Sequence, residues 1–309
     1  RALAGLLSQE CVVPAGLDIL LKEAQRELSL TLSSRQEDAV RKAFTHLISI
    51  VTGGPGTGKT TVQKVMLYIY EKLGGTDVLL TAPTGRASRR MAESTGHMEA
   101  MTMHSALGLT CDEDSAETED MLEAGFIIAD EFTMSDMRLS FEFFCHIRKG
   151  SRLVLVGDID QLPSVGPGNV FRELVQCGVI PVTVLDTVFR QGEDSRIITN
   201  AHRMQENNTS LDYGEGFTFI PAKDAKTAGD LVVELYRTCA DRYGMEQVQV
   251  LSPYRRKGDA SVNSLNERLW EICSRKGNGS LELQSGGHTF RTGDRIIHNK
   301  NREQVSNGD

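Results

Sequence analysis

The sequence predicts an α/β protein with two domains, each built on a doubly wound parallel sheet. Short apolar runs rich in β-branched residues alternate with helical stretches up to about residue 185, as in sheets with helices on both faces. The alternation restarts after about residue 190. At 309 residues the chain is also longer than one ordinary domain. We therefore expect two domains of the same class, the second incomplete within this chain.

Composition is that of a globular protein, with 39% hydrophobic and 25% charged residues. No run approaches the roughly 18 apolar residues that a membrane span needs, so we expect no membrane contact and a cytoplasmic location. The formal charge of −8 argues mildly against a nucleic-acid partner, although a basic channel can exist on an acidic protein. The first residue is Arg1, so we expect a piece of a longer protein.

The six cysteines are widely spread, without a C-x-x-C motif or a nearby histidine cluster. Such spacing favours reduced thiols of a cytosolic protein over a metal site.

The chain begins with a helical pattern over residues 1 to 30, to which we assign no chemistry. Ser34, with Glu37 at the third helical position, then predicts the capped start of a second helix. Gln36 lies in its first turn, where its amide could bond both the donor and acceptor edges of adenine. A solvated glutamine at a helix start is the alternative, and Gln36 alone does not decide between them.

The strongest motif is a glycine-rich loop between a strand at 48–51 and a helix that begins near Lys59. Residues 53–60 fit G-x-x-x-x-G-K-[ST] at every fixed position. Its glycines let consecutive N–H groups point into one concavity, and the helix N-terminus adds positive potential. Lys59 can reach the β- and γ-phosphates, and the Thr60 hydroxyl can bind Mg²⁺. We predict that a nucleoside triphosphate binds to Gly54, Pro55, Gly56, Thr57, Gly58, Lys59, Thr60 and Thr61.

A buried strand over 78–82 follows the phosphate loop and its helix, and it runs into Pro83. Thr84 and Arg86 therefore lie at the carboxyl end of a strand, where open α/β sheets bind ligands. Two further arginines at 89 and 90 extend this basic group, although a solvated helix face explains them equally well.

Thr102 and His104 come next, after a segment rich in methionine. A lone histidine is more often structural than ligand-binding. Residues 111 to 120 carry a block of acidic side chains without periodicity, which predicts a surface loop.

Two carboxylates end the apolar strand predicted at 126–129. After a phosphate loop, Asp130 at a strand tip can hold Mg²⁺, and Glu131 can orient and deprotonate an attacking water. A later strand at 152–156 leads to Gln161, whose neutral amide could sense the γ-phosphate. The strand at 182–185 closes the first set.

The second half predicts helices at 197–204, 228–243 and 261–273, with strands at 217–220 and 248–251. Residues 289–298 predict short strands of a small β module, after a glycine-rich stretch.

This order of motifs resembles superfamily 1 helicases, most closely the RecD/TraA-like branch. The resemblance covers about residues 30 to 309. It rests on residue 36 and on the segments 53–61, 81–87, 102–105, 130–131, 157–165, 189–191, 200–203, 251–253 and 290–295.

The resemblance implies a P-loop NTPase with two RecA-like domains and ATP between them. The implied division is a helical lead-in at 1–30, the first RecA-like domain at 31–185, and an incomplete second domain at 186–280. The start of a small β (SH3-like) insertion follows at 281–309. The family's last motifs would lie beyond this chain.

The resemblance also implies roles. Gln36 would contact adenine, and Arg190 would act as an arginine finger on the transition state. The implied catalytic residues are Lys59, Glu131, Gln161 and Arg190, with Thr60 and Asp130 on Mg²⁺. Single-stranded DNA would contact Pro83, Thr84, Arg86, Thr102 and His104, with movement 5′ to 3′ by analogy, and other DNA-processing proteins are possible partners.

One departure and two alternatives remain. Phe132 follows Asp130 and Glu131 where the family usually has a small residue, and it could pack differently against Gln161. A nucleotide-switch ATPase that serves as an accessory subunit, without unwinding activity of its own, is the main alternative. A small-molecule kinase is disfavoured, because Glu131, Gln161 and Arg190 suit activation of water and kinases exclude it.

Overall fold

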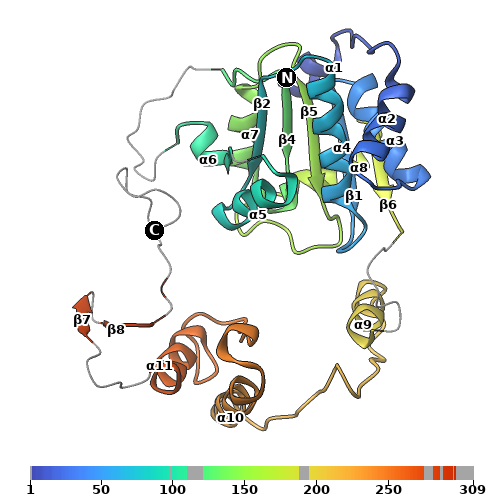
Figure 1. Ribbon diagram of the computed structural model, residues 1–309. Helices are drawn as coiled ribbons and strands as arrows, with labels where there is room; N and C mark the ends of the chain where they lie inside the picture. The colour runs from blue at the N-terminus through green and yellow to red at the C-terminus, as the bar shows by residue number, and fades with distance from the viewer. Residues whose placement is uncertain are drawn as a thin grey trace. The chain divides into compact units, whose positions relative to one another are not determined.

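The computed structural model describes residues 2–97, 99–109, 121–187, 195–274, 281–285, 288–294 and 296. The chain divides into two compact units, Arg1–Asp212 and Tyr213–Asp309. Figure 1 shows the first unit as a sheet covered by helices.

The first unit contains a six-stranded, fully parallel sheet of order β3-β2-β4-β5-β1-β6. Its strands are β1 (Ile48–Gly53), β2 (Val78–Ala82), β3 (Ala100–Thr102), β4 (Phe126–Ala129), β5 (Arg152–Gly157) and β6 (Val182–Leu185). The predicted doubly wound sheet is confirmed, and five strands lie where their apolar runs predicted them. The edge strand β3 was not predicted, because three residues give no periodic pattern.

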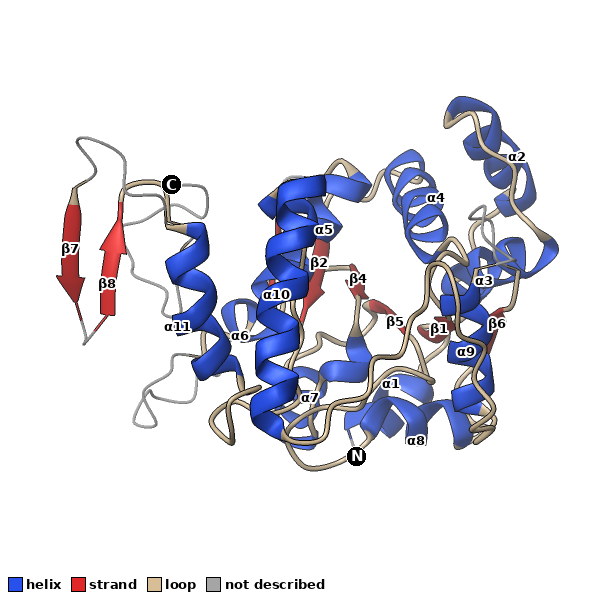
Figure 2. Ribbon diagram, turned by 90° about the horizontal axis from the view of Figure 1, so that it is seen from below, coloured by secondary structure: helices blue, strands red, loops and turns tan. Residues whose placement is uncertain are grey.

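Helices cover both faces of this sheet (Figure 2). One layer holds α2 (Leu17–Glu27), α3 (Ser34–Thr45), α4 (Lys59–Lys72) and α5 (Gly85–Thr95), which share an apolar core with β1 and β4. The other holds α1 (Ala2–Leu7), α6 (Met103–Ala106), α7 (Met137–Cys145) and α8 (Val170–Gln176). Every residue of β1 and β4 is buried, which explains their near-continuous apolar sequence. A further helix, α9 (Arg196–Gln205), ends the first unit's secondary structure.

The start of α3 differs from the sequence prediction by one residue. Ser33, not Ser34, is the N-cap, and its Oγ accepts a hydrogen bond from the Gln36 N–H at 3.3 Å. The Gln36 side chain completes the capping box by accepting from the Ser33 N–H at 2.9 Å. The motif therefore uses Gln36 where Glu37 was expected.

The second unit contains α10 (Ala225–Tyr243), a 3₁₀ turn η2 (Met245–Gln247), α11 (Val262–Cys273) and a hairpin of β7 (Glu282–Ser285) and β8 (His288–Arg291). The helices lie where predicted. The strands predicted at 217–220 and 248–251 do not form: apart from one bridge between Gly214 and Phe217, the described part of these segments pairs with no strand. Leu251 is 88% exposed, so strand propensity alone, without a partner strand, does not fix this conformation.

The β7–β8 hairpin is the described part of the predicted small β module. Trp270 of α11 donates to Asp294 at 2.8 Å, and Arg291 lies over the Trp270 ring at 4.1 Å. An SH3-like fold for this module remains a prediction. Within the described ranges, no helix has both the length and the apolar stretch required to cross a membrane.

Candidate nucleotide-binding site

The phosphate loop connects β1 to α4 through two glycines in the left-handed region. Gly56 has φ 81° and Gly58 has φ 85°, conformations that side chains with a Cβ rarely adopt. A Cβ on Gly53 would lie 2.7 Å from both the Leu185 carbonyl oxygen and Thr57 Oγ1. The loop therefore needs glycine for its turns and for its close approach to β6, as the motif predicted.

Lys59 begins α4 and turns its ammonium back over the loop. Its Nζ donates to the carbonyl oxygens of Gly53 at 2.6 Å and Gly54 at 3.0 Å. Thr57 Oγ1 also donates to the Gly54 carbonyl, at 2.9 Å. Thr60 lies in the first turn of α4 and is partly exposed. A cation and a hydroxyl are thus positioned beside the loop's N–H groups.

The acidic pair follows β4 in an unusual backbone conformation. Asp130 donates its N–H to the Thr81 carbonyl at 2.8 Å, which continues the pairing with β2. Glu131 has φ 50°, rare for a residue other than glycine, and its N–H donates to Asp130 Oδ1 at 2.8 Å.

Glu131 is electrostatically linked to the other predicted catalytic residues. Burial and the neighbouring Asp130 raise its pKa, while Lys59, Arg90 and a hydrogen bond from Gln161 partly offset this rise. The structure thus brings Lys59, Glu131 and Gln161 together at one edge of the sheet. A carboxyl group with a raised pKa suits a general base, because it holds a proton more readily than an ordinary glutamate.

The loop after β5 is tied to two neighbouring strand ends. Thr133 Oγ1 accepts from the Asp158 N–H at 3.0 Å and donates to the Asp158 carbonyl at 3.1 Å. Thr52 Oγ1, just before the phosphate loop, accepts from the Ile159 N–H at 3.1 Å. The Gln161 N–H in turn donates to the Asp158 carbonyl at 3.1 Å. These hydrogen bonds fix the path of the chain between the end of β5 and Gln161.

Two contributors were missed in the sequence. Thr52 and Thr133 each have a signal, a hydroxyl residue directly before the phosphate loop or two positions after the acidic pair. Arg90 was noted as part of a basic group but not as a neighbour of Glu131, because a solvated helix face accounts for it equally well.

Phe132 is fully buried and lies away from the nucleotide site. Its ring packs against Phe143, Phe144 and Phe171, with centroid distances of 6.2, 5.7 and 6.3 Å. The large side chain at this position therefore fills the apolar core beside α7 and α8.

Gln36 is 2% exposed, so it is not a solvated residue at a helix start. Its Nε2 donates to the Thr57 carbonyl in the phosphate loop at 3.1 Å, and its Oε1 accepts from Ser33 as described above. An N–H can only donate and a carbonyl can only accept, so these partners fix the orientation of the amide. The Gln36 amide also has a second N–H and a second oxygen lone pair, which these two hydrogen bonds do not use.

The residues expected to contact DNA gather at two adjacent strand ends. Ala82 of β2 pairs with Thr102 of β3, so Thr84 and Thr102 begin neighbouring segments. Both threonines cap helices: Thr84 accepts from the Ala87 N–H at 3.3 Å and Thr102 from the Ser105 N–H at 3.0 Å. The remaining predicted contacts are Pro83, which is partly exposed, and Arg86 and His104, which are exposed. Arg190 lies outside the described residues.

The residues present fit a nucleoside triphosphate with Mg²⁺. The glycine turns and the α4 N-terminus form an anion site, and Thr60 and Asp130 supply oxygen ligands of the kind Mg²⁺ prefers. In the part of the chain that is described, no cluster of three or more His, Cys, Asp or Glu residues could hold a metal. Phosphate oxygens would therefore have to complete such a Mg²⁺ site.

Comparison with known proteins supports this arrangement. The family described as AAA domain matches residues 31–225. The ATP-dependent RecD2 DNA helicase of Deinococcus radiodurans is 33% identical over 282 residues, covering 90% of this chain and 37% of that protein. RecBCD enzyme subunit RecD of Mycobacterium tuberculosis is 34% identical over 184 residues, covering 52% and 31%. The chain thus spans about a third of the length of these relatives.

Among solved structures, the Pif1 helicase from Candida albicans aligns with a TM-score of 0.46 at 21% identity, over 71% of this chain and 56% of that one. The fold follows from the sheet topology and the family match.

Proposed function

Because this chain belongs to the AAA-domain family and to the RecD-like branch of superfamily 1 helicases, we propose that it forms the ATP-hydrolysing part of a DNA helicase. ATP hydrolysis would drive movement 5′ to 3′ along single-stranded DNA. The observation that carries this proposal is the convergence of Lys59, Glu131 and Gln161 at one edge of the sheet. A binding module would need the Lys59 cation but not the half-buried Glu131 carboxylate.

Each residue has a distinct part in the proposed reaction. Lys59 binds the phosphates with the loop N–H groups, and Thr60 and Asp130 hold Mg²⁺, which would neutralise charge on the phosphate oxygens. Glu131 orients the attacking water and accepts its proton. Gln161 hydrogen-bonds Glu131 and transmits the state of the γ-phosphate. Arg190 is proposed as the arginine finger.

Gln36 is proposed to contact adenine through the N–H and lone pair that the protein leaves unused. Those two groups match the N7 acceptor and the N6 donor of adenine. This role combines with the observed one, because the same amide is bonded to the phosphate loop. Base and phosphate recognition would therefore share one side chain.

Single-stranded DNA is proposed to contact the edge formed by β2 and β3, through Pro83, Thr84, Arg86, Thr102 and His104. Arg86 and His104 are exposed there, as phosphate or base contacts require. The proposed division of the chain is a lead-in at 1–30, RecA-like domains at 31–185 and 186–280, and a β insertion from 281. A cytoplasmic location is part of the same proposal.

Two variants of the full-length protein test the proposed roles. Lys59→Ala should lose both nucleotide binding and hydrolysis. Glu131→Gln should keep ATP affinity within a few-fold but lose roughly 10²–10⁴-fold in turnover, the range for removal of a general base. Equal loss of binding in both variants would refute the division of roles.

A second function has one observation in its favour. One group of relatives is named as a subunit of the RecBCD enzyme. The chain could therefore serve as a nucleotide-dependent accessory subunit whose partner acts on DNA. Rapid translocation on single-stranded DNA by the purified full-length protein alone would exclude this alternative.

A further inference from the structure

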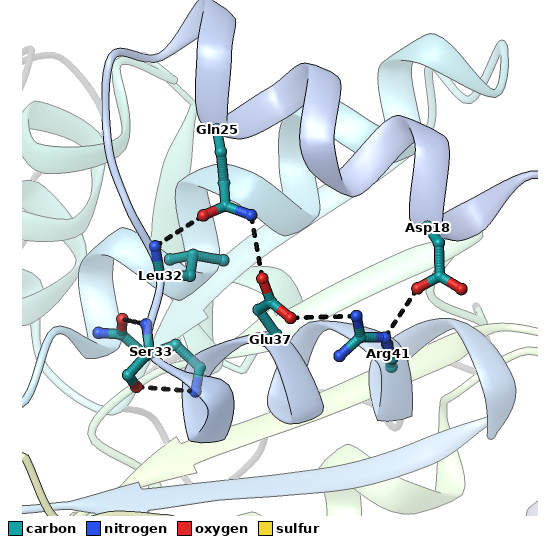
Figure 3. A network of polar contacts seen from close by, with 7 residues as sticks. Asp18, Gln25, Leu32, Ser33, Glu37 and Arg41 are labelled. Atoms are coloured by element: carbon teal, nitrogen blue, oxygen red, sulfur yellow. Dashed lines mark hydrogen bonds and ion pairs between the residues drawn. The ribbon is translucent and has the colours of Figure 1, made fainter.

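The helical lead-in, to which the sequence assigned no chemistry, is joined to the start of α3 by a polar network (Figure 3). Gln25 of α2 lies at its centre. Its Oε1 accepts from the Leu32 N–H at 2.8 Å, and its Nε2 donates to Glu37 Oε1 at 3.2 Å. A single side chain thus holds both the loop that enters α3 and the first turn of α3.

The geometry leaves only one orientation for this amide. The Leu32 N–H can only donate, so the Gln25 oxygen must face it and the NH₂ group must face the Glu37 carboxylate. The other Glu37 oxygen accepts from Arg41 at 3.1 Å, and Arg41 donates to Asp18 of α2 at 2.9 Å. The network therefore starts and ends on α2.

The residues held by Gln25 adjoin the Gln36 contact. Leu32 precedes Ser33, the N-cap whose N–H binds Gln36 Oε1. Gln36 Nε2 in turn bonds the Thr57 carbonyl of the phosphate loop. An unbroken path of hydrogen bonds and peptide units thus joins Gln25 to the loop.

A second contact ties α2 to the helix that follows the phosphate loop. Glu23 Oε1 accepts from Tyr68 Oη at 3.1 Å and pairs with Lys72 Nζ at 3.2 Å, both on α4. Leu17, Leu21 and Ala24 of α2 are buried in the same core as α3 and α4. The apolar face explains why α2 stays in place, but it does not select the orientation of Gln36.

We propose that Gln25 is a positioning residue of the nucleotide site: by fixing the Leu32–Glu37 turn, it holds the Gln36 amide where it meets both adenine and the phosphate loop. This inference rests on the proposed base contact of Gln36. It gives α2 a role in nucleotide selection that packing alone would not have.

The test is the ratio of the Kd for ITP to the Kd for ATP in the full-length protein with Mg²⁺. ITP carries a carbonyl where ATP has its amino group, so a positioned Gln36 should favour ATP. Gln25→Leu should weaken ATP binding by about 3- to 10-fold, the loss expected for about one hydrogen bond. The same variant should change the Kd for ITP less, so the ratio of the ITP Kd to the ATP Kd should fall. The matched control is Arg26→Leu, one position along α2 with a side chain 76% exposed, and it should leave the ratio unchanged.

Exchanging the amide and the carboxylate between positions 25 and 37 distinguishes a positioning role of Gln25 from a general loss of protein stability. Gln25→Glu should reduce the ratio because two carboxylates then face each other. Adding Glu37→Gln should restore it, since the new carboxylate can accept from both Leu32 and the new amide. A ratio that stays at the wild-type value in Gln25→Leu, while Gln36→Ala lowers it, overturns the inference alone. A wild-type ratio in Gln36→Ala overturns the proposed base contact as well.

Discussion

A hydrogen-bonding interaction with Gln161 lowers the pKa of Glu131 and links the segments that follow β5 and β4. The bond favours the ionised form of Glu131 against burial and against Asp130, which both disfavour it. Gln161 therefore affects the acid–base state of the proposed general base as well as sensing phosphate.

Replacing Gln161 by alanine should move the pH dependence of ATP hydrolysis. Loss of the hydrogen bond raises the pKa of Glu131 further, so the acid limb of the kcat profile should shift to higher pH. The measurement is kcat between about pH 5 and 8.5, with Leu162→Ala as the neighbouring control because Leu162 is 85% exposed. An unshifted acid limb would show that the bond does not tune Glu131.

Glu131→Gln should make the fold more stable at neutral pH. The pKa of Glu131 is higher in the folded state than its value of about 4.3 in the unfolded state. The raised pKa therefore contributes folding stability that is fully present below about pH 4.3 and is lost as the pH rises through the folded pKa. The side chain of the Glu131→Gln variant cannot ionise, so the variant does not lose this folding stability as the pH rises. Denaturant unfolding should show a gain at pH 7.5 that shrinks toward pH 4, and a gain independent of pH would contradict this origin.

Phe132→Ala should destabilise the first unit by about 3–5 kcal/mol, the usual cost of removing a large buried aromatic side chain. The ring is fully buried among three other phenylalanines, and the cavity left behind cannot be filled by solvent. Phe141→Ala is the control, because Phe141 of α7 is 61% exposed and should cost far less. Similar unfolding free energies for the two variants would show that Phe132 is not part of the core.

Asp77→Asn should weaken the protein at neutral pH more than in acid. A hydrogen bond from Tyr70 at 2.7 Å lowers the pKa of Asp77, while burial and Asp77 raise the pKa of Tyr70 to about 12. A lowered folded pKa gives stability that is present above the unfolded value of about 3.9 and is lost as pH falls through the folded one.

Thermal unfolding should therefore separate Asp77→Asn from wild type at pH 7, and the difference should shrink as the pH falls below about 3.9. Asp241→Asn, on the exposed side of α10, provides the matched control. A difference that persists at low pH would mean that shape, not charge, matters at position 77.

The sequence predicted the parts of the fold that depend on short-range patterns. Continuous apolar runs located β1, β2, β4, β5 and β6, and β1 and β4 are buried along their whole length. The phosphate loop was predictable for the same kind of reason, since Gly56 and Gly58 take conformations that other residues avoid.

Features that depend on tertiary partners were not predictable. Ser33 and Ser34 are equally good N-caps in sequence, and the structure uses Ser33, which forms the capping box with Gln36. The segments at 217–220 and 248–251 have strand composition but no partner strand among the described residues. The Gln25 network joins residues 7 and 12 positions apart through side chains, which no periodicity records.

ATP hydrolysis that responds to DNA is the activity proposed for this site. It is tested by the steady-state ATPase rate of the full-length protein, measured with and without single-stranded DNA and with Glu131→Gln as the blank. We expect strong stimulation by DNA that weakens with salt, at about 0.7 log unit per phosphate contact per tenfold change in salt, and no turnover in the variant. An ATPase rate that no nucleic acid changes would contradict it.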